Sequence, residues 1–339
     1  MSANVLICDD SNIARKQLAK LIPKDWDAVI HFAENGLEAL DIISVKSIDL
    51  MFLDLNMPVM DGYDTLSRLQ EKAINLKTIV VSGDIQPQAL ERVKQLGALD
   101  FLKKPATQTT VINALELHGL FHSVGDGHAI KIRDDITKIP ATFSLNDCLQ
   151  EVSNIAMGKA ASVLADMLNV FVKLPVPNVN MLEVSELQMA LGYGEKENQC
   201  SAISQGFVGS GIAFEALLIF SDASFPDMAK LLNYSGELDR DAEVELLMDV
   251  SSVLIGPFMS ALGGQLNIDF SHSHPVLLGQ HVPIKDLINI KRAHWKKTLA
   301  VEIVYEVENY QISCDLMLLF TEDSVDVLER LLSYLAEEE

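Results

Sequence analysis

Short apolar runs alternate with longer segments of helical periodicity along the first 121 residues of the chain. Apolar runs of about four to eight residues predict strands, and segments that are apolar at every third or fourth position predict helices. Because strands that alternate with helices form a parallel sheet covered on both faces, we expect a doubly wound α/β fold here. The predicted strands are 4–9, 28–33, 48–55, 76–83 and 99–105, and the predicted helices are 11–23, 36–45, 64–72, 86–97 and 110–121.

Polar side chains stand where four of these strands end. Asp9 and Asp10 close the first strand, Asp54 the third, Ser82 the fourth, and Lys104 the fifth. Ligands of such sheets collect at the carboxyl ends of strands, so we expect these side chains to converge. Converging carboxylates repel one another unless a hard divalent cation lies between them, which favours Mg²⁺. The cation and the ammonium would neutralise a transferring phosphoryl group while the hydroxyl contacts one of its oxygens, which indicates Asp54 as the nucleophile.

Residues 1–121 therefore resemble a CheY-type response regulator receiver domain. The resemblance rests on the acid pair after the first strand, the segment DLNMPVMDG at 54–62, the hydroxyl at Ser82, and the segment FLKKP at 101–105. It implies a flavodoxin-like (βα)5 fold and phosphorylation by a sensor histidine kinase or another phosphodonor.

The same resemblance assigns roles to individual residues. Asp54 is implied to be the phosphoacceptor, and Phe101 takes the aromatic switch position, where it can change rotamer but cannot donate a hydrogen bond. The backbone carbonyl of Asn56 is implied to bind the metal. The implied Mg²⁺ ligands are Asp9, Asp10, Asp54 and Asn56.

A second domain is predicted after a linker. The polar, glycine-containing segment 122–142 predicts a linker with one short strand at 129–132, and the second domain is expected over 143–339. Within it, 220–234 and 320–334 align at an offset of 100 and keep the phenylalanine, the leucine pair and the tyrosine. Each segment follows a strand-like apolar run, so the domain is predicted to be a duplicated α/β unit.

A polar motif occurs once in each half of this domain. The first copy, on the helix predicted over 144–168, places Asp147, Glu151 and Asn154 at spacings of four and three, which puts them on one helix face. An asparagine amide both donates and accepts hydrogen bonds, so it can hold a water in line for attack without acting as a base. Pro177 follows the first copy.

The second copy lies on the helix predicted over 241–262, at an offset of 98. Glu245, Asp249 and Ser252 take the places of the three polar residues, and Pro275 takes the place of the proline. Asp249 is one methylene shorter than glutamate, and Ser252 has no amide with which to orient a water. We expect this copy to be inactive.

The first copy is similar to the motif of the CheC/CheX/FliY family of chemotaxis phosphatases. That motif is Asp or Ser, three residues, Glu, two residues, Asn, 22 residues and Pro, and the first copy matches it throughout. The resemblance implies that Glu151 pairs with the lysine of a phosphorylated receiver and that Asn154 orients the hydrolytic water, with Asp147 and Pro177 supporting the site.

Charge and composition exclude other classes of protein. The net charge is −22, and residues 1–121 carry only 12 basic and 16 acidic residues of the chain's 26 and 48, so the remainder is strongly acidic. A nucleic-acid-binding output domain is therefore excluded, because it would need a basic surface. No run of about 18 uncharged apolar residues and no signal peptide are expected, which predicts a cytosolic protein.

The remaining motifs predict structural roles. The four cysteines form no CxxC pair, so they are expected to be buried thiols. His272 and His274 lack the further ligands that a metal needs. The glycines at 206, 209 and 211 lack the ending of a phosphate-binding loop, so they predict a turn or close strand packing.

The leading hypothesis is a response regulator whose own receiver governs a CheC-like phosphatase of CheY-like receivers. The substrate is a separate CheY-like protein or the chain's own receiver in a partner copy, and a homodimer stays an open alternative. A second hypothesis is a non-enzymatic adaptor that binds a chemotaxis, flagellar or kinase partner. A third is a phosphate sink that drains a kinase through Asp54 alone.

Overall fold

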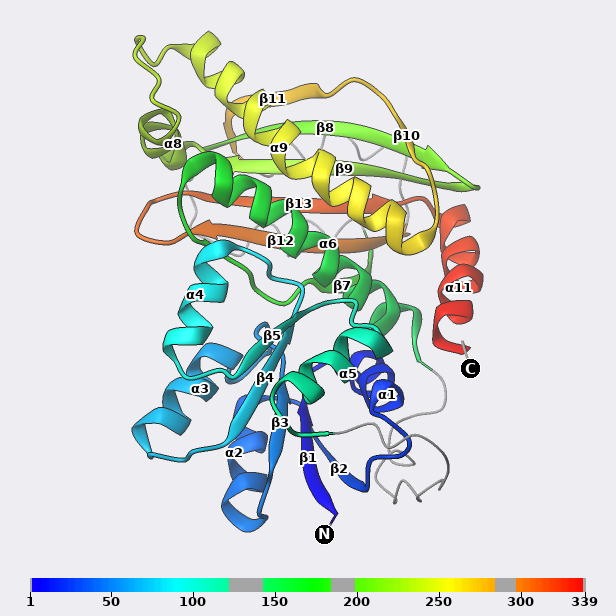
Figure 1. Cartoon of the computed structure of the whole chain (residues 1–339). Helices are drawn as coiled ribbons and strands as arrows, with labels where there is room; N and C mark the ends of the chain where they lie inside the picture. Colours follow the sequence, from blue (N-terminus) through cyan, green and yellow to red (C-terminus); the bar gives the residue numbers. More distant parts are fainter. Residues whose placement is uncertain (1, 122–142, 184–198, 284–296, 338–339) are drawn as a thin grey trace. The chain divides into compact units, whose positions relative to one another are not determined.

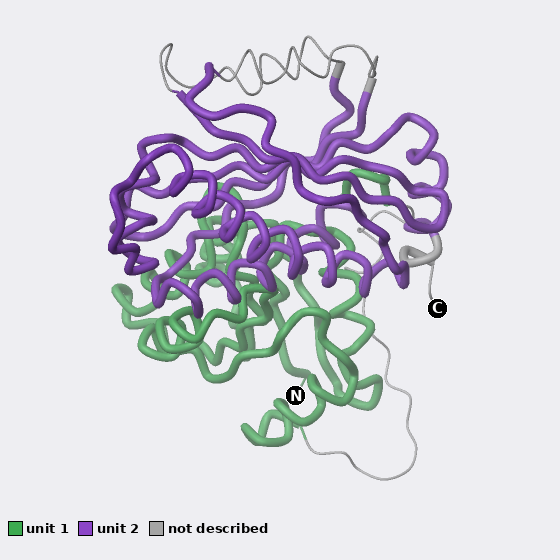
Figure 2. Tube along the Cα trace, turned by 90° about the horizontal axis from the view of Figure 1, so that it is seen from above, with its two compact units in different colours: residues 1–147 green, residues 148–339 purple. Residues whose placement is uncertain are grey.

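A computed structural model gives the fold of two compact units, residues 1–147 and 148–339, which Figure 2 draws in different colours. The predicted linker at 122–142 and its strand at 129–132 lie outside the described residues, so the predicted domain boundaries stay predictions. The described residues are 2–121, 143–183, 199–283 and 297–337.

The first unit contains a five-stranded sheet whose strand order is β2-β1-β3-β4-β5. All four pairings are parallel, which confirms the doubly wound α/β prediction. The strands are β1 (Ala3–Cys8), β2 (Ala28–Ala33), β3 (Leu50–Leu53), β4 (Lys77–Ser82) and β5 (Asp100–Lys103). The helices are α1 (Asn12–Leu21), α2 (Gly36–Val45), α3 (Gly62–Glu71), α4 (Pro87–Gln95) and α5 (Gln108–Leu117).

Two apolar cores cover the two faces of this sheet. One joins Ile7 of β1 to Leu18 of α1 and Leu115 of α5, and the other joins Leu6 to side chains of α2, α3 and α4 such as Leu66. Successive residues of β1 thus enter opposite cores, as a strand buried on both faces requires.

The start of α3 packs tightly on the loop after β3. The helix begins at Gly62, two residues before the predicted start, and the Asp61 side chain caps it by accepting from the Asp64 N–H. A Cβ atom on Gly62 would lie 2.3 Å from the carbonyl oxygen of Asp54. Only glycine permits this approach without displacing the loop that carries Asp54.

The second unit contains an eight-stranded antiparallel sheet with the path β10-β8-β9-β13-β12-β6, on which β11 also pairs with β8 and β7 with β12. Its strands are β6 (Val172–Lys173), β7 (Asn178–Glu183), β8 (Gln199–Gly209), β9 (Ile212–Ser221), β10 (Ser271–His272), β11 (Val276–Pro283), β12 (Lys297–Val307) and β13 (Ser313–Phe320). Its helices are α6 (Leu145–Leu168), η2 (Asp222–Ser224), α8 (Phe225–Leu231), α9 (Arg240–Leu266) and α11 (Glu322–Glu337).

The sheet has an internal pseudo-twofold arrangement, which confirms the predicted duplication. The two halves meet where β9 pairs with β13, and β8, β10 and β11 of one half correspond to β12, β6 and β7 of the other. The correspondence extends to single residues, because Asn169 and Asn267 follow α6 and α9 with the same positive φ of 53°. Asparagine tolerates this left-handed conformation, which commonly ends helices.

The two long helices α6 and α9 cross the same face of this sheet (Figure 1). Helix α9 extends four residues beyond the predicted end at residue 262 and contains Pro257. Of the described helices, α9 is long and apolar enough to cross a membrane by length and composition alone, and 56% of its most apolar window is buried. Serines and glycines interrupt its apolar residues, so α9 contains no unbroken run of about 18 apolar residues.

The glycine-rich segment has the structural role that was expected of it. Ser210 and Gly211 adopt positive φ values of 50° and 82° in the turn between β8 and β9. A Cβ atom on Gly209 would lie 2.8 Å from the carbonyl oxygen of Asp269, so this strand end packs closely. The four cysteines, Cys8, Cys148, Cys200 and Cys314, are buried free thiols.

Candidate phosphoryl-transfer and phosphatase sites

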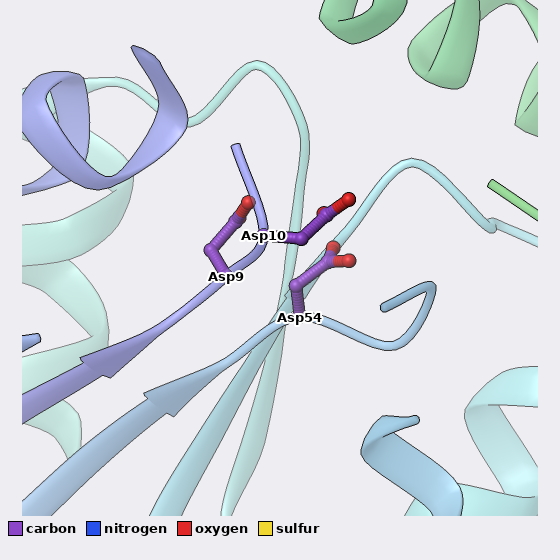
Figure 3. Close-up of side chains that lie close together, drawn as sticks. All are labelled: Asp9, Asp10 and Asp54. Carbon is purple, nitrogen blue, oxygen red and sulfur yellow. The ribbon is translucent and has the colours of Figure 1, made fainter. Parts of the chain in front are cut away.

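Three carboxylates meet at the carboxyl end of the parallel sheet. Asp9 and Asp10 follow β1, and Asp54 follows the neighbouring strand β3 (Figure 3). One oxygen of each carboxylate lies within 4.8 Å of the other two, while Asp9 and Asp54 are only 4% and 1% exposed. The sheet therefore places three carboxyl groups together, two of them almost fully buried.

Lys104 lies between two of these carboxylates. Its Nζ is 2.7 Å from Asp9 Oδ2 and 3.1 Å from Asp54 Oδ1. The backbone N–H of Lys104 donates to the carbonyl oxygen of Ser82 at 2.9 Å, which joins the ends of β4 and β5. The structure thus brings together all four strand ends that the sequence singled out.

The acid cluster fits Mg²⁺, because its donors are oxygens and lie close enough to share one small cation. The backbone N–H of Asn56 donates to Asp54 Oδ2 at 2.9 Å and holds that carboxylate in place. When bound, the cation would supply positive charge to a transferring phosphoryl group. The metal role of the Asn56 carbonyl stays a prediction.

Phe101, at the predicted switch position, is half-buried and packs against the core that includes Leu66 of α3.

A further carboxylate, which sequence reasoning missed, lies buried two residues beyond Ser82: Asp84 is 1% exposed. Burial raises the pKa of Asp84 to about 6, against the lowering effect of hydrogen bonds from Gln86 and Tyr63. Its place just after a strand end was the only signal in the sequence.

The first copy of the polar motif lies on α6 and is buried. Glu151 and Asn154 are 8% and 5% exposed, and Pro177 is also buried. The Oδ1 atom of Asn154 has no hydrogen-bond partner among the described residues. Asp147 lies near the start of the helix, where its Oδ2 accepts from the N–H and Oγ of Ser144. The Asp147 N–H donates in turn to Ser144 Oγ at 3.1 Å, so the two residues form a capping box at the start of α6.

The second motif lies on α9 and is exposed. Asp249 and Ser252 are both solvent-exposed, and the Ser252 hydroxyl donates to the carbonyl oxygen of Met248 at 2.9 Å. Ser252 and Pro275 line a cavity of about 650 Å³ together with aromatic side chains such as Phe207. The described residues that line this cavity include no lysine or arginine.

A half-buried cluster of charged side chains in the second half was also missed by sequence reasoning. His281 lies at an irregularity of β11, where its φ is 56°. Its Nδ1 is 2.7 Å from Asp222 Oδ2 and its Nε2 is 2.7 Å from Glu243 Oε2. The hydrogen bond with Asp222 raises the pKa of His281 from its ordinary value. The cluster therefore fastens the first turn of α9 to the sheet.

His272 has a structural contact instead, because its Nδ1 lies 3.0 Å from Gln205 Nε2.

Comparison with known families agrees with this arrangement. The model of the response regulator receiver domain family matches residues 5–116, and the model of the CheC-like family matches residues 146–181. The second match contains the whole first motif and ends before the second one. The chain thus joins a response regulator receiver domain to a CheC-like segment.

Curated relatives match about a third of the chain. The hybrid signal transduction histidine kinase E of Dictyostelium discoideum is 38% identical over 33% of this chain and 7% of that protein. A protein-glutamate methylesterase/protein-glutamine glutaminase 1 of Syntrophomonas wolfei is 38% identical over 32% of this chain and 31% of that protein. The chain thus spans less than two thirds of the length of these curated relatives. Among solved structures, FliY of Thermotoga maritima is 18% identical over 56% of this chain and 96% of that chain, with a TM-score of 0.42.

Proposed function

We propose that the receiver accepts a phosphoryl group on Asp54 from a histidine kinase or another phosphodonor, with Mg²⁺ held by Asp9, Asp10, Asp54 and Asn56. The cation and Lys104, which lies 3.1 Å from Asp54 Oδ1, would offset the charge of the incoming group. Ser82 would contact a phosphoryl oxygen, and Phe101 would respond by changing rotamer.

We further propose that the CheC-like segment hydrolyses the aspartyl phosphate of a CheY-like receiver. The observation that carries this proposal is the amide oxygen of Asn154, which is buried and has no partner among the described residues. Such an acceptor is suited to a water O–H, so that the water oxygen attacks phosphorus. The bond from phosphorus to the aspartate oxygen breaks, the carboxylate leaves, and the water proton passes to the phosphate or to solvent. Glu151 would pair with the lysine of the substrate receiver.

The proposal includes regulation, because a buried site cannot meet another protein. Glu151 and Asn154 are 8% and 5% exposed, so their helix face must become accessible before a phosphorylated receiver can reach it. We propose that phosphorylation of Asp54 changes the population of the accessible state. We also propose that the chain acts in the cytoplasm, and a homodimer stays an open alternative.

The CheC-like match over residues 146–181 also supports a second candidate function, a phosphorylation-dependent adaptor that binds a chemotaxis, flagellar or kinase partner without hydrolysis. An adaptor needs no amide at Asn154. A phosphate sink, the third hypothesis, would depend on Asp54 alone.

One assay separates these functions. A CheY-like receiver, phosphorylated and freed of its kinase, is incubated with the full chain, and phosphate release is measured with and without acetyl phosphate. We expect Asn154→Ala to lower the catalysed rate about a hundredfold, because water positioning is lost. The matched control is Ser252→Ala at the equivalent place on α9, and we expect it to retain the full rate.

Equal release by the unmodified chain and by Asn154→Ala would refute the phosphatase function and leave the adaptor. Release that survives Asn154→Ala but not Asp54→Asn would identify a phosphate sink instead.

A further inference from the structure

We propose that Asp84 is a positioning residue of the receiver: its buried carboxylate holds the loop between β4 and α4 so that the Ser82 hydroxyl is directed at the phosphoryl group on Asp54. This inference rests on the proposed phosphorylation of Asp54 and concerns how that site is kept ready for it.

Asp84 connects three elements of the receiver. Its Oδ1 accepts from the backbone N–H of Gln86 at 3.1 Å and from Gln86 Nε2 at 3.0 Å. Its Oδ2 accepts from the hydroxyl of Tyr63 in the first turn of α3 at 3.3 Å. Gln86 immediately precedes α4 as its N-terminal cap residue. One carboxylate therefore fastens the loop to the starts of two helices.

The same loop determines how Ser82 can bond. The backbone N–H of Asp84 donates to Ser82 Oγ at 3.1 Å, and both residues are almost fully buried. Because this N–H occupies one acceptor site of the hydroxyl, the Ser82 proton is left to be donated elsewhere. A phosphoryl oxygen on Asp54 is the acceptor that the proposed chemistry would supply.

The donors that hold Asp84 are neutral. They come from Gln86 and from the phenol of Tyr63, whose ring has the Arg92 guanidinium 4.9 Å from its centroid. Tyr63 on α3 is the titratable group that faces the carboxylate, and its own pKa is raised by burial and by the charge of Asp84. A desolvated carboxylate that is held only by neutral donors lacks the stabilisation that a paired cation would give its charge, and burial raises the pKa of Asp84 to about 6.

The direction of the pH effect follows from that raised pKa. Above about pH 6 the group is charged and accepts all three hydrogen bonds, and as the pH falls through about 6 it takes up a proton. A protonated carboxyl donates at one oxygen, where Tyr63 or Gln86 already donates, so the loop loses a contact. We therefore expect phosphorylation of Asp54 to slow as Asp84 becomes protonated.

The test measures the rate at which acetyl phosphate with Mg²⁺ phosphorylates the full chain between about pH 5 and pH 8. We expect the unmodified chain to show a step near pH 6, of about tenfold. Asp84→Asn should lower the rate at neutral pH by a similar factor and remove the step. Tyr63→Phe removes a hydrogen bond that lowers the pKa of Asp84, so the step should move to higher pH.

Asp64→Asn, on the exposed surface of α3, is the control with the same change of charge, and we expect it to leave the step unchanged. An unchanged step in Asp84→Asn, or an unmoved midpoint in Tyr63→Phe, would overturn the role of Asp84 while the chain is still phosphorylated. A chain that is not phosphorylated in any variant would instead overturn the proposed function of the receiver and this inference with it.

Discussion

Helices α6 and α9 occupy equivalent places in a duplicated unit, and yet the equivalent faces of the two helices differ in exposure. The compared positions are Glu151, Asn154, Gly158 and Ser162 on α6 and Asp249, Ser252, Gly256 and Ser260 on α9, each pair separated by 98 residues. All four positions are buried on α6, and all four are exposed on α9.

The intact motif thus lies on the buried face of α6, here called the closed face. The altered motif lies on the exposed face of α9, here called the open face. An open face that carried both the glutamate and the amide could act on any phosphorylated receiver it met. A closed face must first be exposed, so under the proposed function its chemistry would come under the control of phosphorylation at Asp54. On α9, Ser252 stands where α6 has the amide. An open face there would therefore not act on phosphorylated receivers.

The largest expected effect on stability comes from introducing a charge at Ser162 on α6 and comparing it with the same change at the equivalent Ser260 on α9. Ser162 is 8% exposed, so Ser162→Lys buries an ammonium and should lower the free energy of unfolding by about 3 kcal/mol. Ser260→Lys places the same group in solvent, and we expect a change within about 0.5 kcal/mol. Urea titration of both variants measures the difference, and equal tolerance of the two lysines would show that the two faces do not differ in burial.

A smaller effect is expected from His281, which occurs in the half that contains α9. Its pKa is raised by the hydrogen bond with Asp222, so its contribution to stability is complete below its ordinary pKa of about 6.5 and is lost as the pH rises through the raised value. The difference in melting temperature between the unmodified chain and His281→Gln should therefore shrink as the pH rises above about 6.5. A difference that stays constant as the pH rises would contradict an ion pair between His281 and the carboxylates of Asp222 and Glu243.

Much of the receiver could be predicted from the sequence because its strands are continuous apolar runs. Asp9, Asp54, Ser82 and Lys104 lie at strand ends that periodicity alone located, and a parallel sheet must bring such ends to one edge. The spacing of Glu151 and Asn154 likewise predicted a shared helix face.

Other features depend on tertiary structure that no local pattern encodes. The motif segments of α6 and α9 have similar polarity, so the sequence could not tell that Asn154 is buried and Ser252 exposed. Asp84 follows a strand as any loop residue does, and only the packing of α3 shows that it is buried. His281 was missed because the irregularity of β11 breaks the alternation of inward and outward side chains along the strand. The sequence pattern therefore did not predict which way the imidazole points.

The most direct test of the account compares Ser162→Cys with Ser260→Cys, because both replace an oxygen by a sulfur and the four native cysteines are buried. The measurement is the rate at which a maleimide modifies each introduced thiol in the full chain. We predict that the thiol at 260 reacts at least about tenfold faster, since the thiol at 162 must await local opening. Acetyl phosphate with Mg²⁺ should speed the reaction at 162, and Asp54→Asn should abolish that increase. Equal rates at the two positions, or a rate at 162 that ignores the phosphodonor, would contradict the account.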